Sequence, residues 1–378
     1  MNLQRQRFLA LDVFRGITIC FMIIVNTAGS GAEPFAPLRH AVWHGFTPTD
    51  LVFPSFLFAV GNAMSFSLDK YRQISNAAFL RKIFKRTLLI FLLGYLMYWF
   101  PFFRLDAEGF VTSAPLHNTR ILGVLQRIAL CYFFASLLIH YLSTKKVVFV
   151  SIILLTGYWF LLLLFGDASQ PFSMLGNAGE YLDKFLMGNN HLYHGEGIPF
   201  DPEGLLSTIP AIVNVIIGYY AGRFIQKNGR GYDTLARIML VGSLFIFIAL
   251  CWNLVFPINK KLWTSSFVLL TTGLDLIILS ALIYITEIKN WNQYKWPNFF
   301  LILGKNPLFI YLLSELLVVP LDMIRVAPRE NLYQRINTMF FQGIAPGAMG
   351  SLLFAVCYML FCWSIGWWLN KRKIYIRV

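Results

Sequence analysis

Long apolar stretches separated by short polar connections run along the whole chain. About ten of these stretches reach the roughly 20 residues that a helix needs to cross a hydrocarbon core. The expected spans lie near residues 9–30, 49–67, 87–103, 120–142, 147–166, 205–225, 237–256, 263–286, 298–320 and 346–369. We therefore predict an all-α fold, a polytopic membrane helix bundle that forms a single domain over residues 1–378.

The composition supports a lipid bilayer as the surrounding solvent. Hydrophobic residues make up 57% of the chain and charged residues only 13%, against about a quarter charged in soluble domains. The net charge of +14 is spread over short basic tracts between the spans, such as "RKIFKR" and "KRK" and the pair Arg5 and Arg7. Loops retained in the cytoplasm carry such tracts, whereas nucleic-acid binding needs a continuous basic face. We expect both termini in the cytoplasm, no nucleic-acid partner and, from the unpaired cysteines and short inner loops, a bacterial inner membrane.

The connections on the opposite side are longer and more polar. Residues 31–48 carry most of "RHAVWHGFTPTD", and residues 167–204 include "GNNHLYHGEGIPFDPEG". A loop of that second length is unusual and often functional. Its glycines and prolines predict ordered turns capped by Asp201, with Pro202 and Glu203 opening the next helix.

Asp12 and Arg15 lie within the first expected span, in "LDVFRG". Three residues apart on a helix, they share one face, and an ionisable group at membrane depth is a candidate functional group. Two interpretations stay open here: an internal salt bridge, or an anchor for an anionic ligand that enters from the cytoplasm. Gly16 would let a second helix or a ligand approach closely.

Other polar side chains interrupt later apolar stretches. Asn26 stands near the end of the first span, where an amide caps the helix or binds a carbonyl group, and Arg127 lies within the fourth span. In "GKNP", Pro307 predicts a break that would free backbone groups near Lys305 and Asn306 to line a cavity.

The histidines come in two closely spaced pairs, His40 with His44 and His191 with His194. Four-residue spacing on a helix permits a shared metal ion, but zinc sites need further ligands and no HExxH motif is present. Histidine also titrates near neutral pH, so it can accept a proton from an attacking nucleophile. We favour acid–base chemistry over a metal site, with a structural role in the loop as the remaining alternative.

Five separated segments resemble the heparan-α-glucosaminide N-acetyltransferase family and its bacterial homologues. They read "LALDVFRGITICFMIIVN", "HAVWHGFTPTDLVFPSFLFAVG", "RILGVLQRIALCYF", "YLDKFLMGNNHLYHGEGIPFDPEGLLSTIPAIVNVIIG" and "FPINKKLWTSSFVLLTTG". The resemblance implies an acetyltransferase that takes acetyl-CoA from the cytoplasm and delivers the acetyl group to an amino sugar across the membrane. It also implies a homodimer. The absence of a metal is expected from the residues themselves.

The resemblance places the family's active histidine on His40 and its membrane-embedded asparagine on Asn26. His44 stands where the family commonly has asparagine, which favours His40 as the catalyst. Asp50 would orient the histidine or bind the sugar. The expected donor-binding residues are Asp12, Arg15, Arg127, Lys305 and Asn306, and the expected acceptor-binding residues are Trp43, His44, His191, Asp201 and Glu203.

Two other classes of protein fit parts of the pattern. A transporter or flippase for a sugar or a lipid-linked precursor would share the broken helix and the intramembrane charges. A non-catalytic membrane scaffold would explain the hydrophobicity but not the polar cluster at residues 40–50.

Overall fold

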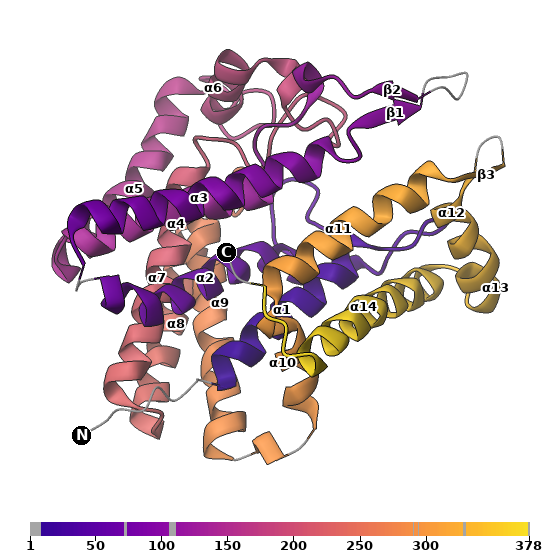
Figure 1. Ribbon diagram of the computed structural model, residues 1–378. Coiled ribbons are helices and arrows are strands. Elements are labelled where there is room, and N and C mark those ends of the chain that lie inside the picture. Colours follow the sequence, from indigo (N-terminus) through magenta and orange to yellow (C-terminus); the bar gives the residue numbers. More distant parts are fainter. Residues whose placement is uncertain are drawn as a thin grey trace.

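The computed structural model describes residues 9–71, 74–105, 111–289, 291–293, 295–327 and 330–376. Arg5 and Arg7, which contributed to the expected topology, lie outside these residues. Long helices dominate the described part of the chain (Figure 1). They are α1 (Leu9–Asn26), α2 (Val52–Tyr71), α3 (Asn76–Trp99), α4 (Val124–Tyr141), α5 (Thr144–Phe165), α7 (Thr208–Asn228), α8 (Tyr232–Trp252), α9 (Ser265–Ile283), α10 (Trp296–Lys305), α11 (Pro307–Met323) and α14 (Ala348–Lys371).

Within the described ranges, eight helices are long and apolar enough to cross a membrane, and the bent pair α10–α11 makes a ninth. Helix α3 has 24 residues but begins at Asn76, well before the expected position near 87, so it includes the basic tract "RKIFKR". That tract keeps α3 out of this apolar set, although α3 occupies the place of the third expected span, near 87–103. The predicted class, an all-helical membrane bundle, is confirmed.

The predicted break at "GKNP" is also confirmed. Helices α10 and α11 meet at an angle of 80°, with Asn306 between them in a non-helical conformation. Pro307 begins α11, where its missing N–H costs nothing. Gly304, Lys305 and Pro307 line a cavity, as expected from the freed backbone.

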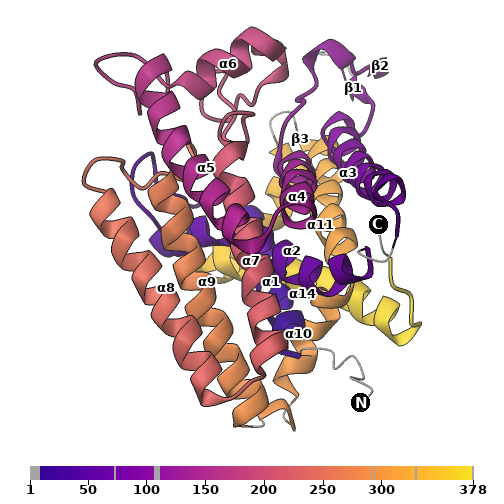
Figure 2. The ribbon, with the colours of Figure 1, turned by 90° about the vertical axis from the view of Figure 1, so that its left-hand side faces the viewer.

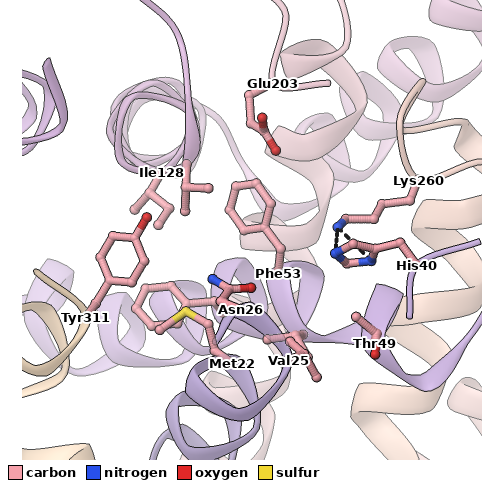
Figure 3. Close-up of a pocket in the computed structure, with 13 residues that line it drawn as sticks. Met22, Val25, Asn26, His40, Thr49, Phe53, Ile128, Glu203, Lys260 and Tyr311 are labelled. Carbon is pink, nitrogen blue, oxygen red and sulfur yellow. Dashed lines mark hydrogen bonds between the residues drawn. The ribbon is translucent and has the colours of Figure 1, made fainter. Parts of the chain in front are cut away.

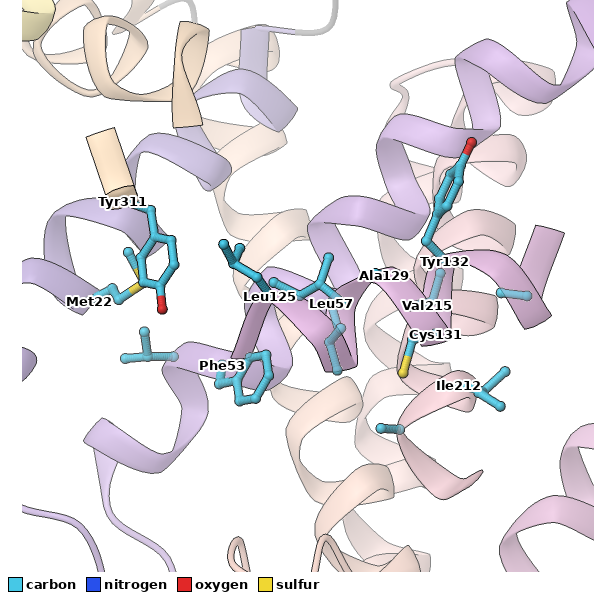
Figure 4. Packing of buried hydrophobic residues seen from close by; sticks show 14 of the residues in the cluster. Met22, Phe53, Leu57, Leu125, Ala129, Cys131, Tyr132, Ile212, Val215 and Tyr311 are labelled. Atoms are coloured by element: carbon cyan, nitrogen blue, oxygen red, sulfur yellow. The ribbon is translucent and has the colours of Figure 1, made fainter. Parts of the chain in front are cut away.

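The core is formed where helices distant in sequence lie side by side. Helix α2 packs along α7, and α8 packs along α9, which Figure 2 shows as a pair at one edge of the bundle. Figure 4 shows Leu57 of α2 beside Leu125 and Ala129 of α4, with Val215 of α7 close by, and all four are buried. This core holds α2 in a fixed position, and α2 carries much of the site described below.

Shorter elements lie outside the long helices. Strands β1 (Phe103–Leu105) and β2 (Val111–Ser113) pair antiparallel, as do β3 (Arg325–Ala327) and β4 (Glu330–Asn331). The other elements are short helices: η1 (Ala36–Leu38), η2 (Pro48–Leu51), η3 (Leu116–Asn118), η4 (Asn189–His191), η5 (Tyr284–Ile288), η6 (Trp291–Gln293), α12 (Leu332–Ile336), η7 (Asn337–Phe341) and α13 (Gln342–Ile344).

The connection after α5 differs from the expected series of turns. It contains a helix, α6 (Ala178–Met187), whose first turn is capped by the Asn177 side chain accepting from the Glu180 N–H at 2.8 Å. Helix α7 begins only at Thr208, so the prediction that Pro202 and Glu203 open it is wrong. Asp201 closes a turn with the Gly204 N–H instead, and its carboxylate pairs with an arginine described below.

Gly16 lies where α1 crosses α10. A Cβ on Gly16 would sit 1.9 Å from the Phe300 carbonyl oxygen, and one on Gly304 would sit 2.4 Å from the Asp12 carbonyl oxygen. Both contacts are with backbone atoms, which cannot rotate away. The close helix–helix approach that the sequence suggested at Gly16 is therefore present.

Gly16→Ala should destabilise the protein by about 1–3 kcal/mol, because the extra methyl group forces α1 and α10 apart. The measurement is the apparent Tm of purified protein in detergent. Gly157→Ala is the matched control: Gly157 lies within α5, and among the described residues no atom lies within 4 Å of the place that an alanine methyl group would take. Alanine there should leave Tm unchanged or slightly raised. Equal Tm values for both variants would contradict the proposed tight crossing.

Candidate active site

A cavity of about 540 Å³ lies where α1, α2, α4 and α11 converge with three loops. Its polar lining comes from Asn26, His40, Glu203 and Lys260, and its apolar lining includes Phe53 (Figure 3). We call it the reaction cavity. It brings together three of the residues predicted from sequence, His40, Asn26 and Glu203.

A second cavity of about 1620 Å³ follows the other half of α2. We call it the donor cavity because two of the residues expected from sequence to bind the donor, Arg15 and Lys305, line it. Three basic side chains, Arg15, Arg86 and Lys305, line it. Phe56 and Ile128 line both cavities, so the two spaces adjoin at these side chains. Since α2 has 20 residues, it is about 30 Å long, which matches the hydrocarbon thickness of a bilayer.

His40 is held by a fully buried carboxylate. Its Nδ1 lies 2.7 Å from Oδ1 of Asp50, whose other oxygen accepts the Thr47 N–H at 2.9 Å and the Ala41 N–H at 3.2 Å. "TPTD" forms this arrangement locally, because Asp50 in the short turn η2 reaches back to the backbone at Thr47. An ionised carboxylate accepts the Nδ1 proton, which leaves Nε2 as the unprotonated acceptor. The imidazole can therefore take up a proton from the cavity.

Lys260, which sequence reasoning did not single out, completes the group. Its Nζ lies 2.9 Å from Nε2 and 3.1 Å from Nδ1 of His40 (Figure 3). Burial lowers the pKa of Lys260 from its ordinary value, against the opposing effects of Glu203 and Asp50. A lysine with a lowered pKa can exchange a proton with the imidazole. Lys260 stands in "FPINKKLW", part of a segment that carries the family resemblance, but a basic residue beside a span is also typical of a topology signal.

Asn26 is the last residue of α1 and faces the reaction cavity. Its amide Nδ2 donates to Oε1 of Glu315 on α11 at 3.1 Å. This bond ties the end of α1 to α11 and fixes the direction in which the amide points. An amide N–H in such a position can donate to a carbonyl or oxyanion.

Glu203 belongs to a cluster around Arg120, a second residue that the sequence did not reveal. Arg120 donates to Glu203 Oε2 at 2.5 Å and to both oxygens of Asp201, at 2.9 and 2.6 Å. Burial alone would raise the pKa of Glu203, but the cations Arg120, Arg127 and Lys260 lower it. Glu203 therefore faces the cavity as a carboxylate.

Three predicted acceptor residues hold loops together and do not line the reaction cavity. Trp43 donates its indole N–H to the Phe172 carbonyl at 2.9 Å. His44 Nδ1 lies 3.4 Å from the Asn259 amide nitrogen, and burial lowers the pKa of His44. His191 Nδ1 lies 2.7 Å from the Thr119 carbonyl oxygen.

Of the predicted donor residues, Arg15 and Lys305 line the donor cavity, and Asp12 forms the salt bridge with Arg15. Arg127 lies elsewhere: it is buried at the start of α4 near the reaction cavity, 4.8 Å over the ring of Trp263, and it donates to Ser207 and the Gly204 carbonyl. The Asn306 side chain is occupied by the backbone of Ile374 and Ile376. Arg86, which the sequence analysis did not name, lines the donor cavity as well.

Metal ligands do not converge in the part of the chain that the structure describes, where no group of three His, Cys, Asp or Glu side chains could hold an ion. His40 and His44 have separate partners. The arrangement around His40 is that of an oriented base with a carboxylate behind it.

Comparison with known proteins gives a consistent match. The family model described as "Heparan-alpha-glucosaminide N-acetyltransferase, catalytic" matches residues 7–248, a range that includes Asn26, His40, Asp50 and Glu203. Heparan-alpha-glucosaminide N-acetyltransferase from Homo sapiens is 28% identical over 364 residues, covering 82% of this chain and 53% of that protein. Its Mus musculus counterpart is 26% identical over 366 residues, covering 82% and 54%. The chain thus spans about half the length of the curated relatives it matches.

Proposed function

The chain belongs to the heparan-alpha-glucosaminide N-acetyltransferase catalytic family, and we propose that it moves an acetyl group across the membrane. The donor is acetyl-CoA on the cytoplasmic side, and the acceptor is the amine of a glucosamine-type sugar on the other side. The observation that carries the proposal is the pair of adjoining cavities along α2, basic at one end and holding an oriented histidine at the other.

The donor cavity has the chemistry that CoA requires. Arg15, Arg86 and Lys305 present cationic donors, which suit phosphate groups. The apolar side chains toward Phe56 and Ile128 suit an extended, weakly polar arm. The thioester would then reach the reaction cavity between those two residues, while the phosphates stay at the basic end.

At the acceptor end, Nε2 of His40 takes a proton from the sugar amine as the nitrogen attacks the thioester carbonyl. The N–C bond forms, the C–S bond breaks, and the CoA thiolate leaves with the electron pair. Asp50 stabilises the imidazolium, and the Asn26 amide supports the carbonyl oxygen as negative charge develops. Lys260 or the imidazolium returns a proton to the thiolate. A route in which His40 is first acetylated uses the same residues.

The bent helix pair α10–α11 is the one observation that favours a transporter or flippase instead, since broken helices form many transport sites. The two functions separate in sealed vesicles that contain the purified protein. With labelled acetyl-CoA on one side and glucosamine on the other, the transferase yields N-acetylglucosamine on the acceptor side only. Uptake of sugar without acetyl-CoA, together with no acetylated product, would replace the proposal with the transporter.

Arg86→Gln should raise KM for acetyl-CoA about 10-fold, because it removes one charge-assisted contact worth about 1.4 kcal/mol. KM for glucosamine should stay unchanged, since Arg86 lies in the donor cavity. Initial rates at varied concentrations of each substrate measure both constants. Arg81→Gln removes an exposed charge from the same helix and serves as the control. A donor KM equal in the two variants would place the CoA phosphates elsewhere.

A further inference from the structure

An aromatic groove of about 810 Å³ lies beside the reaction cavity. Its lining includes Tyr98, Trp99, Phe103, Asn118, Arg120 and Tyr193. The side chains come from the end of α3, the β1 strand, the residues just before α4 and the long connection before α7. The catalytic, donor and acceptor residues predicted from sequence all lie outside this lining.

Trp99, the largest ring of the groove, is held in place by contacts with neighbouring segments of the chain. The Trp99 indole N–H donates to the Ala114 carbonyl at 3.1 Å, and its ring packs edge-to-face on Phe102 with centroids 4.9 Å apart. The strand pairing of β1 with β2 holds the segment that carries Ala114. The Trp99 ring therefore presents its face without needing to be ordered by a ligand.

The charge of the groove disfavours an anionic ligand. Arg120 lies between the rings of Tyr98 and Tyr193, at 5.0 and 4.7 Å, but its charge is already paired with the carboxylates of Asp201 and Glu203. A phosphate or sulfate group would compete with those carboxylates. Flat aromatic faces beside an amide such as Asn118 suit the C–H faces and hydroxyl groups of an uncharged sugar ring.

One ion pair separates the groove from the reaction cavity. Glu203 lines the cavity, Arg120 lines the groove, and the two are joined by the 2.5 Å hydrogen bond. When the terminal amine of a saccharide lies at His40, the sugar units that follow would extend past this pair. The groove lies on the other side of the pair.

We propose that the aromatic groove is a second saccharide subsite, which binds the sugar units that follow the acetylated one. This inference rests on the proposed function, because it assumes that the terminal amino sugar occupies the reaction cavity. It makes the acceptor an oligosaccharide, with Trp99 as its main stacking platform and the Arg120–Glu203 pair between the two subsites.

The test compares glucosamine with a β-1,4-linked tetramer in which a terminal glucosamine is followed by three N-acetylglucosamine units, which carry no charge. For the unaltered protein, kcat/KM should be about 10-fold higher for the tetramer, and isothermal titration of purified protein without acetyl-CoA should show tighter binding of the tetramer. Trp99→Ala should abolish this preference, and Asn118→Ala, at an exposed position, should reduce it about threefold. Trp99→Phe keeps an aromatic face and should retain part of it. Trp291→Ala removes an equally large, half-exposed indole from another loop and should leave the preference unchanged.

Equal kcat/KM and equal affinity for the two saccharides would overturn the subsite even if acetyl transfer itself proceeds. A preference that persists in both Trp99→Ala and Asn118→Ala would overturn it as well. If no saccharide is acetylated, the proposed function fails, and the titration without acetyl-CoA then decides whether the subsite exists. An affinity for the tetramer that falls in Trp99→Ala supports the subsite. An affinity that is the same in Trp99→Ala overturns it.

Discussion

Replacing His40 with alanine should lower kcat for acetyl transfer by about 1,000-fold or more, with the protein still folded in the membrane. His40 is the group in the reaction cavity whose unprotonated nitrogen can accept the amine proton, and general-base catalysis contributes about 100- to 10,000-fold. The same substitution also removes the partner of Lys260 and Asp50. Formation of N-acetylglucosamine by purified protein at saturating substrates measures the effect.

His117→Ala is the matched control for this experiment. His117 lies on the exposed turn η3, away from both cavities, so its loss should leave kcat unchanged. Binding of acetyl-CoA, measured separately, should be retained in His40→Ala, because the basic side chains lie in the other cavity. An active His40→Ala protein would remove histidine from the reaction and leave Lys260 as the candidate base.

Direct attack by the sugar and transfer through an acetylated His40 can be separated by comparing the unaltered protein with His40→Ala. Incubation with acetyl-CoA and no acceptor should yield acetylated protein only if His40 carries the acetyl group as an intermediate. Intact-mass measurement before and after addition of glucosamine would follow its formation and release. Direct attack by the sugar predicts no such species, while the requirement for His40 is the same in both routes.

The sequence could predict most of the helical framework because the signals are local. Apolar runs of membrane-spanning length give the helices, and the proline of "GKNP" gives the break between α10 and α11. Two helices begin at residues other than those expected from sequence. Helix α3 extends back through its basic tract to Asn76, and α7 starts at Thr208, because Asp201 is drawn into an ion pair with Arg120.

The site could be predicted only where a motif marks it. His40, Asn26 and Glu203 stand in recognisable segments, and the structure brings them to one cavity. Lys260 is 220 residues from His40 in the chain, and no spacing rule connects positions so far apart. Arg86, Arg120 and Lys260 lie near the ends of the spans expected from sequence, where basic residues usually report topology, so the cavities that they line became visible only in the folded chain.

Some residues that stand out in the sequence have structural partners in the folded chain. Arg127, Trp43 and His191 are polar or aromatic residues in conspicuous places, which made them candidates from sequence. In the structure each is bonded to the backbone of another segment. Buried polar groups need hydrogen-bond partners wherever they lie. A polar residue that stands out in the sequence can therefore hold two segments together as readily as it can bind a ligand.

Asp50→Asn should lower kcat by about 100- to 10,000-fold while changing the shape of the site very little. The reason lies in the two backbone N–H groups of Thr47 and Ala41, which both donate to the same oxygen of Asp50. An asparagine must turn its carbonyl oxygen toward these donors, so its NH2 group faces Nδ1 of His40. The imidazole then accepts at Nδ1 and carries its proton on Nε2, the tautomer that cannot take a proton from the amine.

A merely structural aspartate would give a different result. In Asp50→Asn the asparagine keeps the hydrogen bonds to the backbone but reverses the tautomer of His40. Tm and both KM values should therefore stay close to those of the unaltered protein, and only kcat should fall. Asp233→Asn, at an exposed position on α8, controls for loss of a carboxylate. If Asp50→Asn kept its activity, the tautomer of His40 would not matter and the base would have to be another group. If Tm fell together with kcat, Asp50 would act by holding the loop, and the role of an oriented imidazole would lose its support.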